Sequence, residues 1–334
     1  MATRRLNRHQ RWRIDKVQQE RQQRLEKKLA KASQSIDPGE LGPEEAGLLI
    51  ANYGASVELE DEHGVLHRCV LRQNLPPMVV GDTVIWQRSQ QGGVVTARQP
   101  RRSELAKPDM HGQIKAVAAN IDQILVVAAP APEYSTDLID QYLVAAELTG
   151  VSPCLIFNKI DLIDQASQAT IDTILQRYRQ IGYTVLTAST LANHGLQEVE
   201  QQLRGHTSVF VGQSGVGKSS LVRAFIPQQT ITVGELSAHS GLGQHTTSTA
   251  RLYHLPQGGA LIDSPGVRDF RLWPVSEDIL LGGFRDLAPY QGRCKFRDCS
   301  HRHEPGCALL EAEKRGEISS VRLQSYQRLA SQMR

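Results

Sequence analysis

The sequence predicts three folded parts: a small β-barrel, an α/β domain built on a parallel sheet, and a short helical segment that binds a metal ion. Three observations support this division. Residues 50–98 hold short runs rich in Val, Ile and Leu, residues 114–270 alternate apolar runs with helical stretches, and three cysteines with a histidine gather in 294–307. We expect a multidomain β and α/β protein with parts at 1–40, 45–104, 110–273 and 274–334.

The bulk composition excludes several classes of protein. The 334 residues are 40% hydrophobic and 22% charged, which is ordinary for a soluble globular chain. No run approaches the roughly 18 apolar residues of a membrane helix. Basic residues at the N-terminus have no apolar core behind them, so they do not form a secretory signal. We therefore expect a cytoplasmic protein that does not enter a membrane.

The net charge of +3 hides a strong asymmetry along the chain. Residues 1–35 hold eleven Lys/Arg and three Asp/Glu, a net charge of +8, so the remainder carries a net charge of −5. A basic arm on a mildly acidic body indicates a polyanionic partner such as RNA, since neutralised phosphates release counterions. The alternative is a solvated tail with no partner.

The all-β part, residues 45–104, has strand-like segments separated by turn residues. The segments are 50–60, 65–71, 79–87 and 93–98. A five-stranded barrel of the oligonucleotide-binding (OB) type fits this length, and beside the basic arm it is expected to bind RNA. A barrel with no ligand is the alternative. Residues 101–111 are interpreted as a linker.

From residue 114 the pattern is typical of a doubly covered parallel sheet. The run 124–129 is continuously apolar, as a strand buried on both faces requires. Further apolar strands end just before polar or glycine-rich loops, at 154–157, 184–186, 209–211 and 260–262. Helices are expected around 137–149, 167–181, 195–203 and 218–225. Ligands of such sheets bind at the carboxyl ends of the strands.

A phosphate-binding loop follows the strand at 209–211. Residues 212–219 read Gly-Gln-Ser-Gly-Val-Gly-Lys-Ser, the G-x-x-x-x-G-K-S pattern, and a helix follows them. Its glycines let backbone N–H groups face the phosphates. Lys218 is expected to reach the β and γ phosphates during catalysis, and the Ser219 hydroxyl to bind Mg²⁺. The expected nucleotide contacts are Gly212, Gln213, Ser214, Gly215, Val216, Gly217, Lys218, Ser219 and Ser220.

A guanine-reading motif, Asn158-Lys159-Ile160-Asp161, follows the strand at 154–157. The Asp161 carboxylate can accept from N1–H and from the exocyclic amine of guanine, whereas adenine offers neither donor. An unpaired carboxylate costs about 1–3 kcal/mol, so GTP and GDP are favoured. Lys159 should pack along the base, and Asn158 should brace the loop. At the end of the next strand, Thr187-Ala188-Ser189 is expected to read the guanine O6 through a backbone N–H.

Two further segments resemble the switches of nucleotide hydrolases. Asp263-Ser264-Pro265-Gly266 supplies a D-x-x-G element, in which Asp263 holds Mg²⁺ through water and the Gly266 N–H senses the γ-phosphate. The glycine-rich segment 241–249 is expected to form the first switch. Its Thr247 is the chosen residue to complete the Mg²⁺ shell, with Thr246 as the alternative.

The residue after the D-x-x-G element is Val267, where a water-orienting glutamine stands in Ras-like enzymes. Valine cannot orient water, so slow intrinsic hydrolysis is expected. His245, in the first switch, is the nearest polar candidate for that catalytic role. The alternative for His245 is a packing or hydrogen-bonding residue of the switch.

The metal-binding pattern lies near the C-terminus. Three thiols and one imidazole suit a closed tetrahedral zinc site, and four protein ligands leave no open position for catalysis. His303 is a competing imidazole. Zn²⁺ would stabilise a segment too short to build its own core, 274–334. The expected ligands are Cys294, Cys299, His301 and Cys307, while Cys69 and Cys154 are expected in apolar cores.

The order of the two nucleotide motifs is unusual. The guanine reader at 158–161 precedes the phosphate loop at 212–219, the reverse of ordinary GTPases. Both motifs end buried strands, so one sheet can bring them together whatever the chain order. We therefore expect a circularly permuted P-loop GTPase domain.

The ordered set of barrel, Asn-Lys-Ile-Asp, phosphate loop, His-Thr-Thr switch, Asp-Ser-Pro-Gly and Cys/Cys/His/Cys cluster resembles one family over nearly the whole chain. It is the bacterial circularly permuted GTPase family dependent on the small ribosomal subunit, RsgA/YjeQ. The resemblance implies a monomeric GTPase that binds the 30S subunit and its 16S rRNA late in assembly. Hydrolysis would be stimulated by the subunit. The chain also runs straight from the D-x-x-G element at 263–266 into the zinc-bearing segment, so we predict that loss of the γ-phosphate moves that segment and governs release from the subunit. GTP or GDP, Mg²⁺ and one structural Zn²⁺ are the implied cofactors.

Two other classes make different predictions. A nucleotide-regulated RNA-binding scaffold would show GTP-dependent RNA affinity without subunit-stimulated hydrolysis. A signalling or membrane-linked GTPase would carry a lipid anchor or an amphipathic membrane helix, and neither is evident in the sequence. A phosphate-transferring kinase is a further alternative, but such an enzyme would have no use for the guanine-reading motif and the switch elements.

Overall fold

The structure is a computed structural model that describes residues 41–54, 56–89, 92–109, 112–226, 250–264, 267, 270 and 272–333. The chain divides into two compact units, the first ending at Arg101 and the second beginning at Arg102. The basic arm expected at residues 1–40 lies outside the described residues, as does the first switch at 241–249.

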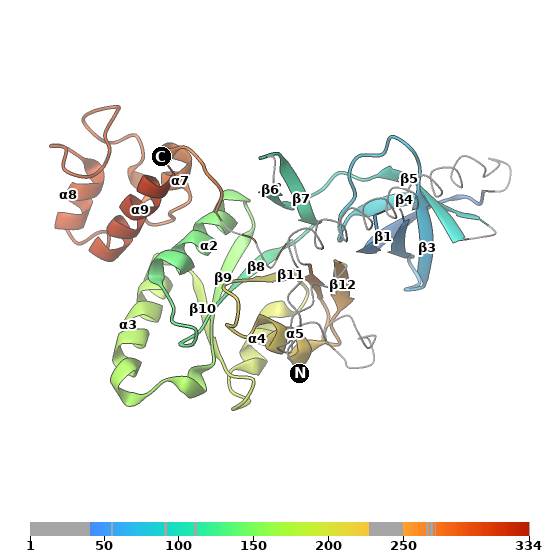
Figure 1. Cartoon of the computed structure of the whole chain (residues 1–334), viewed down its shortest axis with the longest axis horizontal. Helices are drawn as coiled ribbons and strands as arrows, with labels where there is room; N and C mark the ends of the chain where they lie inside the picture. The colour runs from blue at the N-terminus through green and yellow to red at the C-terminus, as the bar shows by residue number, and fades with distance from the viewer. Residues whose placement is uncertain are drawn as a thin grey trace, which may run out of the picture. The chain divides into compact units, whose positions relative to one another are not determined.

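The first unit contains a closed barrel of five strands (Figure 1). Neighbouring strands pair in the order β1, β2, β3, β5, β4, and β4 returns to pair with β1. All pairs are antiparallel except β3 with β5. Closure leaves no free sheet edge within the barrel, as predicted for an OB-type fold. The strands are β1 (Glu44–Asn52), β2 (Ser56–Glu60), β3 (Leu66–Leu71), β4 (Thr83–Ser89) and β5 (Gly92–Arg98).

The largest side chain in the core of the barrel is a tryptophan. Trp86 is fully buried, and its indole N–H donates to the Ala46 carbonyl. A Cβ on Gly93 would lie 2.6 Å from the Trp86 ring and 2.7 Å from the Cys69 sulfur. Glycine is therefore required at this position because the ring occupies the space of a side chain. Cys69 is 1% exposed, which confirms its predicted core position.

Two sequence expectations in this region were wrong. Residues 50–60 were expected as one segment, but β1 and β2 form a hairpin that turns near Gly54, whose φ is +84°. The expected linker at 101–111 contains the strand β6 (Glu104–Pro108). It pairs antiparallel with β7 (Ile114–Ala119) in a two-stranded sheet of the second unit. A short polar strand is defined by its partner more than by its own residues.

The second unit is built on a sheet with strand order β10, β9, β8, β11, β13, β12. The first five run parallel, as predicted, and β12 pairs antiparallel with β13. Helices join the strands and cover both faces, so β8 is buried along its whole length. The strands are β8 (Gln123–Ala128), β9 (Ser152–Asn158), β10 (Thr184–Ala188), β11 (Thr207–Val211), β12 (Arg251–His254) and β13 (Ala260–Asp263).

The helices divide between the two faces of this sheet. Leu125 and Val127 of β8 share one apolar core with α4 and α5, and the α2 helix packs on β8 and β9. The predicted helices are confirmed with small shifts of their ends. They are α2 (Thr136–Leu148), α3 (Gln165–Ile181), α4 (Leu196–Leu203) and α5 (Lys218–Phe225). Cys154 lies in the core shared with α4 and α5, as predicted.

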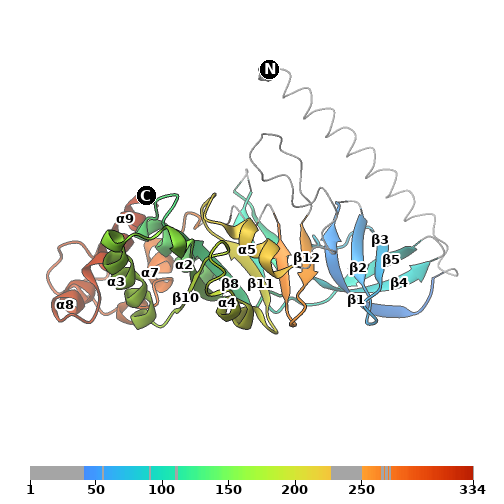
Figure 2. The same ribbon diagram turned by 90° about the horizontal axis from the view of Figure 1, so that it is seen from below.

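The C-terminal segment is helical and packs beside α2 (Figure 2). Its apolar core includes Phe284, Leu309 and Tyr326, and it also takes in Val144 of α2. The segment is therefore joined to the α/β sheet by a continuous buried surface. Its helices are α7 (Glu277–Gly282), the 3-10 helix η5 (Ala288–Tyr290), α8 (Ala308–Lys314) and α9 (Ser320–Gln332). None of the helices described is long and apolar enough to cross a bilayer.

Candidate nucleotide and metal sites

The predicted phosphate loop connects β11 to α5. Gly212, Gly215 and Gly217 all adopt positive φ angles, so the backbone makes the tight turns that a phosphate loop needs. The Lys218 ammonium lies over the loop, 2.7 Å from the carbonyl oxygens of both Gly212 and Gln213. N–H groups at the start of α5 add positive potential on the same side. The geometry suits a chain of phosphates held against the loop.

The guanine-reading motif meets the phosphate loop directly, although 58 residues separate the two groups in contact. The Asn158 side chain is 1% exposed, and its amide donates to the Val216 carbonyl at 2.9 Å. A Cβ on Gly217 would lie 2.2 Å from the Asn158 amide nitrogen, so only glycine fits there. Strand β8 lies between β9 and β11, and all three end at the same edge of the sheet. The predicted permutation thus produces one continuous site.

The rest of the motif forms the rim of this site. Lys159 adopts a left-handed conformation, and its ammonium donates to the Ala131 carbonyl at 2.9 Å. Asp161 lies in the short helix η2 (Ile160–Leu162) with its carboxylate at the surface. The buried Ser189 hydroxyl donates to that carboxylate. Ser189 therefore orients Asp161 while leaving its other lone pairs open to a ligand.

The three residues expected at the end of β10 have different environments. Thr187 and Ala188 belong to the strand and pair with Phe157 and Asn158 of β9. Ser189, the first residue after the strand, contacts the carboxylate of Asp161 through its side chain. It is held in place by the Ala192 N–H, which donates to its hydroxyl at 3.0 Å.

The loop between β8 and α2, residues 129–135, is part of this site and was missed in the sequence. The carbonyl of Ala131 in this loop accepts the hydrogen bond from the Lys159 ammonium. Pro132 lies against the phosphate loop, with its Cδ 3.3 Å from the position that a Cβ on Gly215 would take. The available signal was its position. It follows a buried parallel strand whose neighbours on both sides end in ligand-binding loops.

The switch elements are described only in part. Asp263 is the last residue of β13, which is the neighbour of β11, the strand that leads into the phosphate loop. The next residue, Ser264, is 5% exposed. Val267 is 1% exposed, so its side chain faces the core. Gly266 and the residues expected in the first switch, His245, Thr246 and Thr247, lie outside the described residues.

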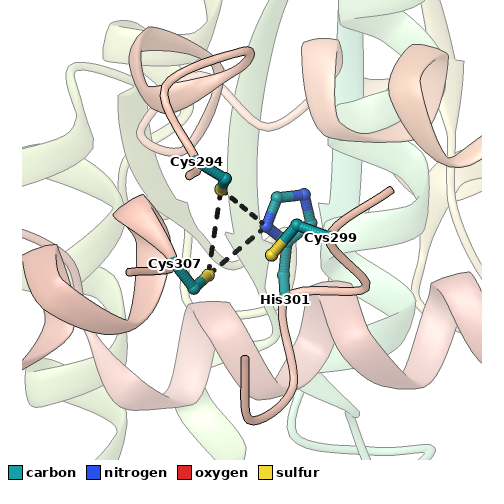
Figure 3. A group of neighbouring side chains, drawn as sticks. All are labelled: Cys294, Cys299, His301 and Cys307. Atoms are coloured by element: carbon teal, nitrogen blue, oxygen red, sulfur yellow. Dashed lines mark hydrogen bonds between the residues drawn. The ribbon is translucent and has the colours of Figure 1, made fainter. Parts of the chain in front are cut away.

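The four predicted metal ligands converge at one point (Figure 3). The His301 Nδ1 lies 3.4 Å from the Cys294 sulfur and 3.5 Å from the Cys307 sulfur, which are 4.0 Å apart. Tetrahedral zinc would set these separations at about 3.6 Å for S–N and about 3.8 Å for S–S. Together with Cys299, all ligand atoms lie within 4.8 Å of one another. The donor set and its spacing both fit zinc.

The surroundings of the cluster support a metal site. The Ala308 N–H donates to the Cys294 sulfur at 3.3 Å. Burial raises the pKa of the Cys299 thiol to about 12, so a bound cation is needed to stabilise its thiolate. The competing residue His303 is exposed and is not one of the four converging ligands.

The fold and these sites define a circularly permuted P-loop GTPase with a three-thiol, one-imidazole metal cluster. Residues 98–273 match the model of the RsgA GTPase family. The chain belongs to that family, which confirms the resemblance seen in the motifs.

Full-length relatives and solved structures agree. The chain is 51% identical to "Small ribosomal subunit biogenesis GTPase RsgA" of Ectopseudomonas mendocina over 100% of this chain and 98% of the relative. The Pseudomonas aeruginosa protein of the same name is 49% identical with the same coverage. YjeQ from Thermotoga maritima superposes with a TM-score of 0.72 at 30% identity, covering 87% of this chain and 99% of that chain. YloQ, a circularly permuted GTPase, gives 0.70 at 27%, covering 90% and 98%.

Proposed function

We propose that this protein hydrolyses GTP to GDP and phosphate on the small ribosomal subunit, late in the maturation of that subunit, and that its GTP state governs its release. The observation that carries the proposal is the hydrogen bond from Asn158 to Val216, which joins a guanine reader to a phosphate loop. Relatives that match the whole chain bear the name of a small-subunit biogenesis GTPase. Stimulation by the subunit is part of the proposal, because buried Val267 cannot orient the attacking water.

We propose nucleotide contacts from both motifs. Asp161 accepts from the guanine N1–H and amine, and Lys159 lies along the base. Ser189 orients the Asp161 carboxylate, and the loop that leaves β10 after Ser189 supplies the N–H for the guanine O6. Phosphates lie against 212–217 and the first turn of α5, including Ser219 and Ser220, with Gly266 as the γ-phosphate sensor.

Charge on the phosphates is offset by Lys218 and by a magnesium ion. Ser219, Asp263 and Thr247 would hold Mg²⁺, directly or through water, and the ion would stabilise charge that develops on the transferred group. Ser219 is the second residue of α5, and Asp263 ends β13, the strand that pairs with β11. His245 is proposed to orient the attacking water from the first switch.

One zinc ion has a structural role. Cys294, Cys299, His301 and Cys307 would occupy all four positions, so no substrate could reach the metal. We also propose the domain limits 45–104 for the barrel, 110–273 for the GTPase domain and 274–334 for the zinc segment. The protein acts as a cytoplasmic monomer without a membrane partner.

The metal-binding loop offers a surface for 16S rRNA. Arg293, Lys295, Arg297 and Arg302 are all exposed around the cluster. Phe296 is 43% exposed, and the Lys295 ammonium lies 5.6 Å from its ring centre. Cations beside an exposed aromatic ring suit phosphates next to an unstacked base. The basic arm and the barrel would provide further RNA contacts.

Purified small subunits are expected to accelerate GTP turnover by this protein by at least about tenfold, because Val267 follows the D-x-x-G element and cannot orient the attacking water. The measurement is phosphate release with and without 30S subunits over a range of salt. Stimulation should fall as salt rises, since phosphate contacts release counterions. GTP binding without stimulation would instead favour the nucleotide-regulated scaffold and reject the assembly role.

Substituting His245→Ala is expected to lower subunit-stimulated kcat by about tenfold or more, with GTP affinity little changed, because a water-orienting group acts only in the hydrolytic step. His254→Ala, at the exposed end of β12, is a matched control. A stimulated kcat that stays within about threefold of the unsubstituted protein would remove His245 from this role.

A further inference from the structure

The C-terminal helix α9 contacts both the metal-binding loop and the GTPase domain. Toward the metal cluster, the Gln327 amide donates to the His301 carbonyl at 2.6 Å. The Arg302 guanidinium donates back to the Gln327 carbonyl at 3.3 Å and to the Ser331 hydroxyl. The helix is therefore held firmly to the loop that carries the metal ligands.

Two arginines of α9 reach the first two turns of helix α2. Arg328 binds both carboxylate oxygens of Asp137, at 2.6 and 2.7 Å. One turn further along α2, Arg322 binds Asp140 and also Asp286, the latter at 2.8 Å. Bidentate arginine–carboxylate pairs fix geometry as well as charge.

The inner pair is buried and is shared with a third helix. Arg322 and Asp140 are each 1% exposed, and the Tyr178 hydroxyl of α3 donates to Asp140 at 2.8 Å. Burial by itself disfavours the charged guanidinium, but Asp140 and Asp286 outweigh it and raise the pKa of Arg322. The Arg322 guanidinium also lies 4.6 Å from the ring centre of Phe284. Removing one partner of such a network leaves an uncompensated buried charge.

Helix α2 begins directly after the loop at 129–135, which touches both nucleotide motifs. Ala131 in that loop accepts from the Lys159 ammonium, and Pro132 packs against Gly215. Only three residues lie between Pro132 and Thr136, where α2 begins. A shift in the first turn of α2 therefore moves the carbonyl that holds Lys159 and the proline that supports the phosphate loop.

We propose that Arg322 and Arg328 of the C-terminal helix are positioning residues for the guanine-nucleotide site, acting through α2 and the loop at 129–135. The inference rests on the proposed nucleotide site. Both GTP and GDP should depend on these arginines, because the loop contacts the base-reading lysine and the phosphate loop rather than the γ-phosphate alone. By thermodynamic reciprocity, bound nucleotide should tighten the docking of α9 on α2.

The outer pair provides the test, because Arg328 and Asp137 are 47% and 29% exposed and their substitution leaves the buried network intact. Arg328→Gln is expected to weaken mant-GDP and mant-GppNHp binding alike, by about three- to tenfold, as coupling energies of this kind allow. At saturating GTP, subunit-stimulated kcat should stay within about twofold. Arg328→Lys should restore much of the affinity.

Arg315→Gln is the matched control, since Arg315 pairs with Glu317 in the same segment. In an Asp137→Asn background, Arg328→Gln should cause no further loss, which identifies the pair as the route. Equal nucleotide affinities for Arg328→Gln and Arg315→Gln would overturn the proposal. If the unsubstituted chain binds neither mant-GDP nor mant-GppNHp, the proposed function itself is rejected.

Hydrogen exchange provides an independent readout that needs no substitution. Adding GDP to the full chain should slow amide exchange in α9 and in the first two turns of α2, while α8 changes little. Unchanged exchange in α9 on GDP binding would contradict the coupling, even if the arginine variants were to fold poorly.

Discussion

Substituting Asp161→Asn is expected to weaken GTP binding by about 100-fold, because the asparagine amide would point an N–H at a guanine donor. The carboxylate already accepts the Ser189 hydroxyl, and its remaining lone pairs face the surface. Losing one guanine hydrogen bond and leaving a second donor unpaired costs about 1–3 kcal/mol each. Since 1.4 kcal/mol is tenfold in affinity, the two losses together give the expected factor.

The same substitution should raise the affinity for xanthosine triphosphate, which carries a carbonyl where guanine carries the amine. Equilibrium titrations with labelled GTP and XTP measure both effects in one protein preparation. Asp172→Asn is the control, because Asp172 is an exposed carboxylate on the neighbouring helix α3. An unchanged ratio of GTP to XTP affinity would show that Asp161 does not contact the base.

Substituting Cys307→Ser is expected to abolish stoichiometric zinc binding and to unfold much of the segment 274–334. Cys307 is 1% exposed, occupies the N-cap position of α8 and lies in the core with Leu309 and Tyr326. A structural zinc ion contributes about 10–16 kcal/mol to small zinc-dependent folds. A hydroxyl is a poor replacement for a thiolate, so most of that contribution should be lost.

Zinc content and hydrogen exchange of α7, α8 and α9 measure this outcome together. His303→Ala is a matched control, because His303 is an imidazole in the same loop that lies outside the cluster. The control should keep one zinc ion per chain and a folded segment. Full zinc content in Cys307→Ser, or loss of zinc in His303→Ala, would show that the ligand set is wrong.

The elements that the sequence predicted well are long or fully buried. The helix at 167–181 has strong periodicity and the run at 124–129 is continuously apolar, and the structure has α3 and β8 at these places. The same reasoning joined two strands at 50–60, because both are apolar and the turn between them has no strong turn cluster. The expected linker contains β6, a five-residue strand of mixed polarity that pairs with β7.

The nucleotide and metal motifs could be predicted from the sequence because each is defined by residues that lie close together in the chain. A glycine loop with Lys218 or a carboxylate at Asp161 is defined by a few adjacent residues, so spacing alone indicates it. The role of Arg322 could not be predicted from a local pattern. In the sequence it resembles any arginine on a surface helix, and its burial arises because Asp140 and Asp286 come from segments far away in the chain.

By itself, the sequence determined which chemical groups this protein carries: a guanine reader, a phosphate loop, switch elements and four metal ligands. The tertiary structure decided which of them meet. Asn158 contacts Val216 because β9, β8 and β11 end at one edge of a parallel sheet, where chain order has no effect on proximity. The docking of α9 on α2 depends on packing between distant segments, and no local pattern encodes it.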